Sequence, residues 1–166
     1  WAYLRAVVAR GELAHAYLFA GPASVGQRAV AEALAQELLC GKAAHDFGGC
    51  GACEDCIAVR GRAHPDVIIL SPAERLATDA EKKEIGIEDV HELTRRLAAT
   101  AWRGGWRVAM VDGVERMSRE AMTALLKTLE EPGERTVFLL IAETASGMLP
   151  TIRSRAVPLA FTPVAD

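Results

Sequence analysis

The stretch that decides the fold is residues 17–28, which read YLFAGPASVGQR. Its first four residues form an apolar run typical of a short buried strand, and Gly21 and Pro22 end this run. After Gly26 the apolar residues recur at helical spacing as far as about Cys40. A strand, a turn with two glycines five residues apart and a helix together form the frame of a phosphate-binding loop.

Two positions of this loop depart from the working pattern, G-x-x-x-x-G-K-[ST]. Gly21 and Gly26 are kept, but Gln27 stands where Lys neutralises phosphate charge, and Arg28 stands where a hydroxyl holds Mg²⁺. Arg28 carries positive charge, although its planar guanidinium differs from a lysine point charge. The loop itself fits either a degenerate nucleotide site or a glycine-rich turn without a ligand. It fits an active ATPase less well than either of these.

Strand-like and helix-like segments alternate along the rest of the chain. Further strands are predicted at 67–70, 108–112, 137–142 and 157–161. Helices are predicted at 27–40, 87–101, 118–131 and 148–154, and an exposed loop at 73–84. This alternation predicts an α/β fold, a parallel sheet with helices on both faces. Ligands of such sheets bind at the carboxyl ends of the strands, where Gly21, Asp112 and the loop after Ala142 fall.

Asp112 ends an apolar run and is a candidate for the acidic motif of an ATPase. Such enzymes place two acidic residues there, one for Mg²⁺ and one for the attacking water. Gly113 occupies the second position, and Glu115, displaced by two residues, is expected to point elsewhere. Departures from the pattern at both the loop and this strand end favour a protein that does not hydrolyse nucleotide.

The cysteines form a cluster with the spacing C-x9-C-x2-C-x2-C. They are Cys40, Cys50, Cys53 and Cys56. Four closely spaced thiolates with glycines between them suit a tetrahedral Zn²⁺ and leave no open position for water, so a structural zinc is favoured over free thiols. His45 and His64 are further candidate ligands, although His64 is expected to form structural hydrogen bonds instead.

The composition bounds the remaining possibilities. With 19 basic and 22 acidic residues the net charge is −3, so no overall positive field favours nucleic acid. No apolar stretch approaches the roughly 18 residues that span a bilayer, and no signal-peptide pattern is present, which predicts a cytoplasmic protein without a membrane partner. The segment WRGGWR, residues 102–107, mixes Trp with Arg, and packing around a turn is favoured over stacking on bases.

Several segments together resemble the bacterial clamp-loader family of AAA+ proteins. HAYLFAGP, the cysteine cluster, HPD, MTALLKTLEEP and IRSR occur in the expected order and cover nearly the whole chain. The resemblance implies a P-loop NTPase-like three-layer fold, in which a five-stranded parallel sheet is flanked by helices. It also implies one domain over residues 1–166 with a zinc-binding insertion at about 40–61, and lid and collar domains outside this chain.

The resemblance assigns roles to individual residues. The four cysteines match the family's zinc ligands. Ser154 and Arg155 match the start of its Ser-Arg-Cys motif, whose Arg reaches the ATP of the neighbouring subunit, and Ala156 replaces the Cys. Arg153 is expected to be solvated. Thr144 lies near the family's sensor position.

The family contains ATP-hydrolysing gamma/tau subunits and a subunit whose nucleotide site is degraded. Gln27, Arg28 and Gly113 place this chain with the latter. The resemblance thus implies a non-hydrolysing member of a ring with gamma/tau and delta that helps load the sliding clamp on primed DNA. ATP and ADP are expected not to bind tightly. The alternatives are a gamma/tau-like ATPase in which Arg28 replaces the Lys, and a separate zinc-binding DNA module.

Overall fold

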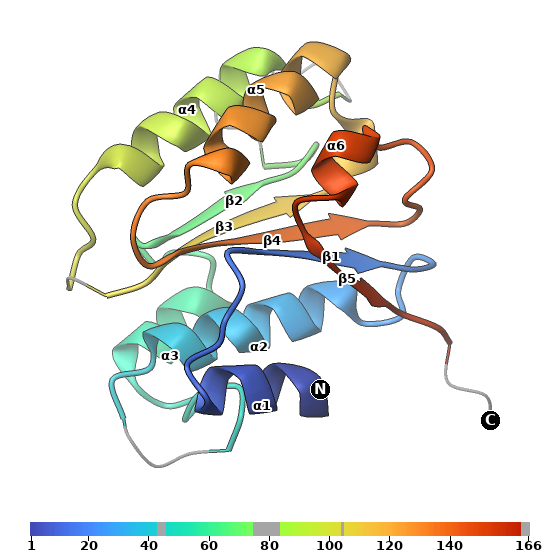
Figure 1. Cartoon of the computed structure of the whole chain (residues 1–166). Coiled ribbons are helices and arrows are strands. Elements are labelled where there is room, and N and C mark those ends of the chain that lie inside the picture. Colours follow the sequence, from blue (N-terminus) through green and yellow to red (C-terminus); the bar gives the residue numbers. More distant parts are fainter. Residues whose placement is uncertain (43–45, 75–83, 104, 164–166) are drawn as a thin grey trace.

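A five-stranded parallel sheet forms the centre of the protein (Figure 1). The computed structural model describes residues 1–42, 46–74, 84–103 and 105–163. The strands are β1 (Ala16–Ala20), β2 (Val67–Leu70), β3 (Arg107–Asp112), β4 (Thr136–Ala142) and β5 (Val157–Ala160), and their order in the sheet is β2-β3-β4-β1-β5. The helices are α1 (Ala2–Ala9), α2 (Gln27–Leu39), α3 (Glu54–Arg60), α4 (Ile87–Ala98), the 3₁₀ turn η1 (Val114–Arg116), α5 (Arg119–Glu130) and α6 (Pro150–Arg153).

Helices cover both faces of the sheet, so the protein has three layers (Figure 1). Strand β4 shows how one apolar run serves two cores, because successive side chains point to opposite faces. Phe138 and Leu140 belong to the core beneath α4, α5 and α6. Val137 and Leu139 belong to the core above α1, α2 and α3. Burial on both faces explains why this strand is apolar throughout.

The predicted strands are all present, and the main differences from the prediction concern helices. The helix predicted at 87–101 ends at Ala98, and α1 and α3 had not been predicted. Cys53 is the N-cap of α3, and its sulfur accepts a hydrogen bond from the Cys56 amide, so a residue expected to bind metal also caps a helix. Most of the loop predicted at 73–84 lies outside the described residues. In the described part of the chain, no helix is long and apolar enough to cross a membrane.

Candidate functional site

A cleft of about 470 Å³ lies at the carboxyl ends of the central strands. Its walls come from the segments that follow β1, β2, β3 and the end of β4. The lining residues are Ala23, Ser24, Gly26, Gln27, Arg28, Ser71, Pro72, Ala73, Asp112, Gly113, Glu115, Arg116, Ile141, Ala142 and Glu143. The structure thus brings the glycine-containing loop and Asp112 together at the edge of the sheet where ligands of α/β proteins bind.

The side chain of Gln27 closes the loop on itself. Its amide nitrogen donates hydrogen bonds to the carbonyl oxygens of Gly21 at 2.6 Å and Pro22 at 2.8 Å. Only 5% of the residue is exposed. A lysine at this position would reach toward phosphate, whereas the Gln27 amide uses both its N–H groups inside the protein.

Both loop glycines have structural reasons to be present without any nucleotide. Gly26 is the N-cap of α2 and has a φ of 101°, a left-handed conformation that favours glycine. A Cβ on Gly21 would lie 2.3 Å from the carbonyl oxygen of Phe161, which follows β5. The glycine spacing therefore has a structural explanation in a tightly packed turn.

Arg28 is the centre of an ion-pair cluster in the cleft. Its guanidinium lies 3.1 Å from Glu32, 3.2 Å from Glu74 and 3.0 Å from Asp112. Burial alone lowers the pKa of Arg28, but the hydrogen bonds with Glu32 and Glu74 raise it above its ordinary value. For Glu74 burial raises the pKa, but hydrogen bonds from Arg62 and Arg28 lower it, and the resulting pKa lies below the ordinary value. The positive charge of Arg28 is thus already matched by carboxylates.

The acidic motif is altered at the backbone as well as in its side chains. Asp112 accepts a hydrogen bond from Arg28, so the carboxylate that would hold Mg²⁺ in an ATPase is engaged. Gly113 has a φ of 84°, and a Cβ there would lie 3.4 Å from Pro72. A glutamate at this position would be strained in the present backbone.

Glu115 lines the cleft, so the expectation that it points elsewhere was wrong. The left-handed Gly113 and the 3₁₀ turn η1 bring the chain back toward the strand ends. Its Oε1 accepts a weak hydrogen bond from the Glu143 amide at 3.4 Å. Its Oε2 is buried and has no hydrogen-bond partner among the described residues. Spacing along the sequence did not reveal this turn.

The cleft offers no spare positive charge from the described residues. Its basic lining residues are Arg28 and Arg116, and Arg116 pairs with Glu143 at 3.3 Å. Asp112, Glu115 and Glu143 add negative charge to the same walls. A polyphosphate would have to displace these ion pairs and approach walls with more carboxylates than cations, so this lining disfavours tight binding of ATP or ADP.

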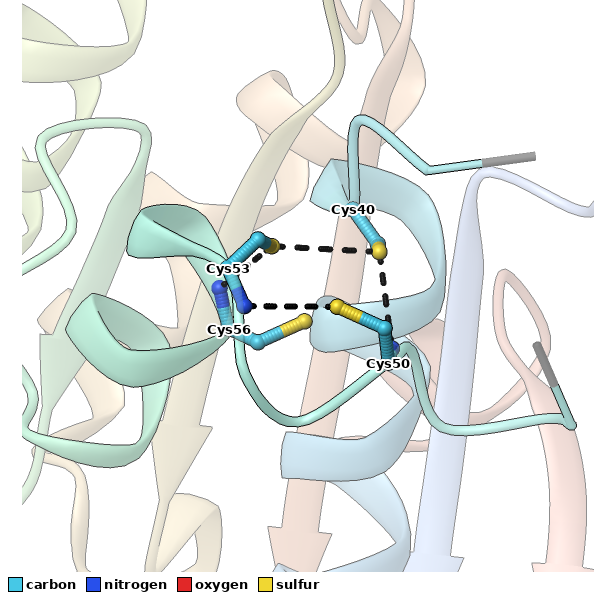
Figure 2. Close-up of side chains that lie close together, drawn as sticks. All are labelled: Cys40, Cys50, Cys53 and Cys56. Carbon is cyan, nitrogen blue, oxygen red and sulfur yellow. Dashed lines mark hydrogen bonds between the residues drawn. The ribbon is translucent and has the colours of Figure 1, made fainter. Parts of the chain in front are cut away.

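The cysteines predicted to bind metal converge between α2 and α3 (Figure 2). The four sulfur atoms of Cys40, Cys50, Cys53 and Cys56 all lie within 4.8 Å of one another. The sulfurs of Cys40 and Cys53 are 3.9 Å apart. A tetrahedral zinc with Zn–S bonds of about 2.3 Å needs sulfur separations of about 3.8 Å. The donor set is therefore close enough, and of the right kind, to hold one metal ion.

Backbone groups support the charged state of this cluster. Amide hydrogens of Ala52 and Cys53 bond to the Cys50 sulfur and lower its pKa to about 6, while burial raises the pKa of the Cys56 thiol to about 12. A cation beside Cys56 would favour its thiolate. A Cβ on Gly49 would lie 2.7 Å from the Cys56 sulfur, so the chain can pass there only as glycine.

Of the two histidine candidates, His64 is not among these ligands. His64 accepts a hydrogen bond at Nδ1 from the Asp66 amide at 3.0 Å, and its Nε2 lies 3.3 Å from Asp55. The structural role expected of His64 is therefore confirmed. His45 lies outside the described residues.

The two tryptophans of the segment WRGGWR differ in their exposure to solvent. Trp106 packs against the core, as predicted, but Trp102 is 71% exposed, so the packing prediction was wrong there. The backbone amide of Trp102 donates to Asp66 at 2.8 Å, which holds the turn and leaves the indole at the surface. Arg103 pairs with Asp55 at 3.2 Å and thereby joins this turn to α3.

Arg155 lies at the opposite end of the sheet from the cleft. It precedes β5, which is parallel to β1, whereas the cleft lies beyond the strand ends. Its guanidinium pairs with Glu130 at 2.5 Å and donates to the Thr151 carbonyl oxygen at 2.9 Å. The adjacent Ala156 is buried in the core. Arg153 is exposed, as expected.

Thr144 stands outside the residues that line the cleft. Its hydroxyl bonds to the Ser146 hydroxyl at 2.9 Å and the residue is exposed. The preceding residue, Glu143, lines the cleft instead. Glu143 is paired with Arg116, and the sensor role of Thr144 stays a prediction.

Comparisons with known sequences agree with this geometry. The family model described as "DNA polymerase III, delta subunit" matches residues 1–165. DNA polymerase III subunit delta' of Pseudomonas aeruginosa is 43% identical over 89% of this chain and 43% of that protein. Subunit delta' of Haemophilus influenzae is 37% identical over 85% of this chain and 40% of that protein. Subunit tau of Escherichia coli is 34% identical over 87% of this chain and 21% of tau.

Solved structures support the fold. A DNA polymerase III gamma subunit-related protein of Thermotoga maritima has a TM-score of 0.63 at 22% identity, over 96% of this chain and 45% of that one. The RuvB Holliday junction branch migration motor of the same organism has a TM-score of 0.50 at 19% identity, over 95% of this chain and 41% of that one. The AAA+ three-layer fold implied by the resemblance is confirmed.

The chain spans about two-fifths of the length of the delta' relatives it matches. The match of the family model over nearly every residue nevertheless shows the family. The chain belongs to the family of DNA polymerase III delta' subunits.

Proposed function

We propose that this chain is the AAA+ domain of a clamp-loader subunit that hydrolyses no nucleotide itself. The observation that carries the proposal is the ion pair between Arg28 and Asp112, because it joins the two altered motifs of an ATPase to each other. The side chain in the Mg²⁺-binding position of the loop is thus bonded to the carboxylate that would hold the same ion. The subunit would act in a ring with gamma/tau and delta subunits to load the sliding clamp on primed DNA.

The chemical contribution of the subunit would be Arg155, offered in trans. Support comes from its place, because Arg155 lies at the far end of the sheet from the cleft of its own chain. A surface arginine in that position can approach a phosphate only on a neighbouring molecule. Such an arginine stabilises the charge of a transferring phosphoryl group and contributes roughly 10³–10⁵ in rate in other NTPases.

The cysteine cluster would hold a structural zinc. The four thiolates of Cys40, Cys50, Cys53 and Cys56 would complete its coordination and leave no position for a reacting water. The ion would tie the end of α2 to the start of α3 and contribute folding free energy. The family's lid and collar domains would lie outside residues 1–166, and the subunit would work in the bacterial cytoplasm.

Nucleotide binding by the purified protein tests the first part of this proposal. Titration calorimetry with Mg–ATP is expected to give no tight binding, and incubation with ATP no phosphate release above buffer. The second candidate function, a gamma/tau-like ATPase, is favoured by the 34% identity to E. coli tau. Magnesium-dependent turnover by this chain would establish that candidate and refute the proposal.

A further inference from the structure

We propose that Glu130 is a latch on Arg155, which holds the arginine on its own subunit until a neighbour's phosphate displaces the carboxylate. This inference rests on the proposed role of Arg155 in trans. Glu130 is the last residue of α5, and Arg155 follows α6, so their ion pair connects the end of one helix to the end of another. Their charged atoms are 2.5 Å apart.

The guanidinium is held but not enclosed. One side contacts Glu130 and the Thr151 carbonyl oxygen, and a longer contact of 3.4 Å reaches the Ser154 hydroxyl. The side chains of Arg155 and Glu130 remain 34% and 49% exposed. A ligand from another molecule can therefore reach the same guanidinium without any rearrangement of the fold.

The position of Glu130 is unfavourable for a carboxylate on local grounds. The carboxyl end of a helix carries partial negative charge and prefers a basic residue. Here α5 ends at Glu130, and Glu131 follows it. The last turn contains Lys127, and Arg155 supplies a cation in direct contact with Glu130.

Glu131 differs from Glu130 in having no such partner. It is exposed and pairs with no cation in the described part of the chain. A residue that departs from a local preference and is compensated by one specific partner often has a functional role.

A phosphate and the Glu130 carboxylate compete for the same donors. Both accept charge-assisted hydrogen bonds from a guanidinium, and the phosphate of ATP carries more charge. An exposed ion pair is weak, so a neighbour's nucleotide can break it. While the pair is formed, Glu130 also lowers the positive potential that Arg155 presents to an approaching subunit. With this latch, Arg155 would contact the neighbouring subunit only when that subunit holds ATP.

The test uses the full-length subunit assembled with gamma/tau and delta subunits, with ATP as the titrant. Glu130→Gln removes the competing charge and keeps the size of the side chain. It is expected to lower the ATP concentration that half-saturates hydrolysis by up to about fivefold, the factor to which 1 kcal/mol corresponds. The effect should shrink as salt rises, because exposed charges are screened.

The matched control is Glu131→Gln, which makes the same charge change one residue along the helix end and should leave the half-saturating ATP concentration unchanged. A double variant, Glu130→Gln with Arg155→Ala, should behave as Arg155→Ala alone. If Glu130→Gln leaves the half-saturating concentration unchanged or raises it while Arg155→Ala lowers hydrolysis, the latch is refuted and the trans role stands. If Arg155→Ala itself changes nothing, the proposed function of Arg155 fails.

Discussion

At the scale of single residues, the loop shows how a motif can keep its backbone and lose its chemistry. Gln27 turns its amide inward to the carbonyl oxygens of Gly21 and Pro22. Arg28 turns its charge toward carboxylates of the same chain. Both substitutions replace contacts that a nucleotide would supply with contacts inside the protein. The polar side chains of the loop therefore have partners without a ligand.

Arg28→Ala tests how much this internal pairing stabilises the fold. The change leaves Glu32, Glu74 and Asp112 close together without their shared cation, and it is expected to lower the free energy of unfolding by about 1–2 kcal/mol. Urea unfolding at neutral pH measures this difference. Arg153→Ala, which removes an exposed arginine, is the control and should change the free energy of unfolding little.

The effect of Arg28→Ala depends on pH in a defined direction. Because the folded pKa of Glu74 lies below its unfolded value, the stability it contributes is present above the unfolded pKa. That contribution is lost as pH falls through the folded pKa. The difference between wild type and Arg28→Ala should therefore shrink in acid, below about pH 4. A difference that grows in acid would contradict the assignment of the ion pair.

At the scale of elements, the cysteine cluster decides how α2 and α3 meet. The sulfurs come from the end of α2, the intervening loop and α3 itself (Figure 2). A short seven-residue helix has little intrinsic stability, so its position depends on what anchors it. A metal ion would bind both helices at once.

Zinc removal and Gly49→Ala test this anchor. Protein purified without chelator should contain about one zinc per chain, and elemental analysis giving less than about half an equivalent would contradict a four-thiolate site. Stripping the metal should lower the melting temperature by roughly 6–12 °C, as a loss of about 3 kcal/mol would in a protein of this size. Gly49→Ala should reduce zinc content, because its Cβ would meet the Cys56 sulfur.

The control for Gly49→Ala is Gly41→Ala. The nearest atom to a Cβ on Gly41 is an oxygen of Asp55 at 3.9 Å, an ordinary contact. The control should therefore bind zinc like the wild type. Equal zinc content in both variants would show that Gly49 does not shape the site.

The fold was predictable wherever one apolar pattern settled the structure. Each strand had a continuous apolar run, and the helix predicted at 118–131 matches α5, whose N-cap Ser118 accepts a hydrogen bond from the Ala121 amide at 3.1 Å. Helix α3 was missed because its sequence, EDCIAVR, is too short to show a helical period. The position of Glu115 was missed because it depends on the backbone conformation of Gly113, which spacing does not encode. The contacts of Arg28 join segments far apart in sequence, so no local pattern could reveal them.

At the scale of the whole molecule, the two ends of the sheet carry different groups. The cleft end holds an internally paired cluster, and Arg155 lies at the opposite end, before β5. Under the proposed function, such a subunit would give a catalytic group to one neighbour and would need no nucleotide of its own. In a ring, this division makes the activity a property of an interface between subunits.

Arg155→Ala in a reconstituted ring tests this division. The rate of ATP hydrolysis at the neighbour's site that Arg155 would enter should fall by a factor of roughly 10³ or more. The total rate of hydrolysis by the ring should fall by the fraction that this one site contributes. Clamp loading should fall as well. Steady-state phosphate release and a loading assay measure the two effects, with exposed Arg153→Ala as the matched control. Unchanged rates in both assays would refute the trans role.

The cluster around Arg28 has a mechanical consequence for the ring. It bonds the start of α2 to the segments after β2 and β3, a connection that bound phosphate and Mg²⁺ make in NTPases and release after hydrolysis. Here the connection consists of the protein's own side chains and needs no nucleotide. Under the proposed function, it would persist while neighbouring subunits hydrolyse ATP, and this domain would keep one shape while its neighbours change theirs.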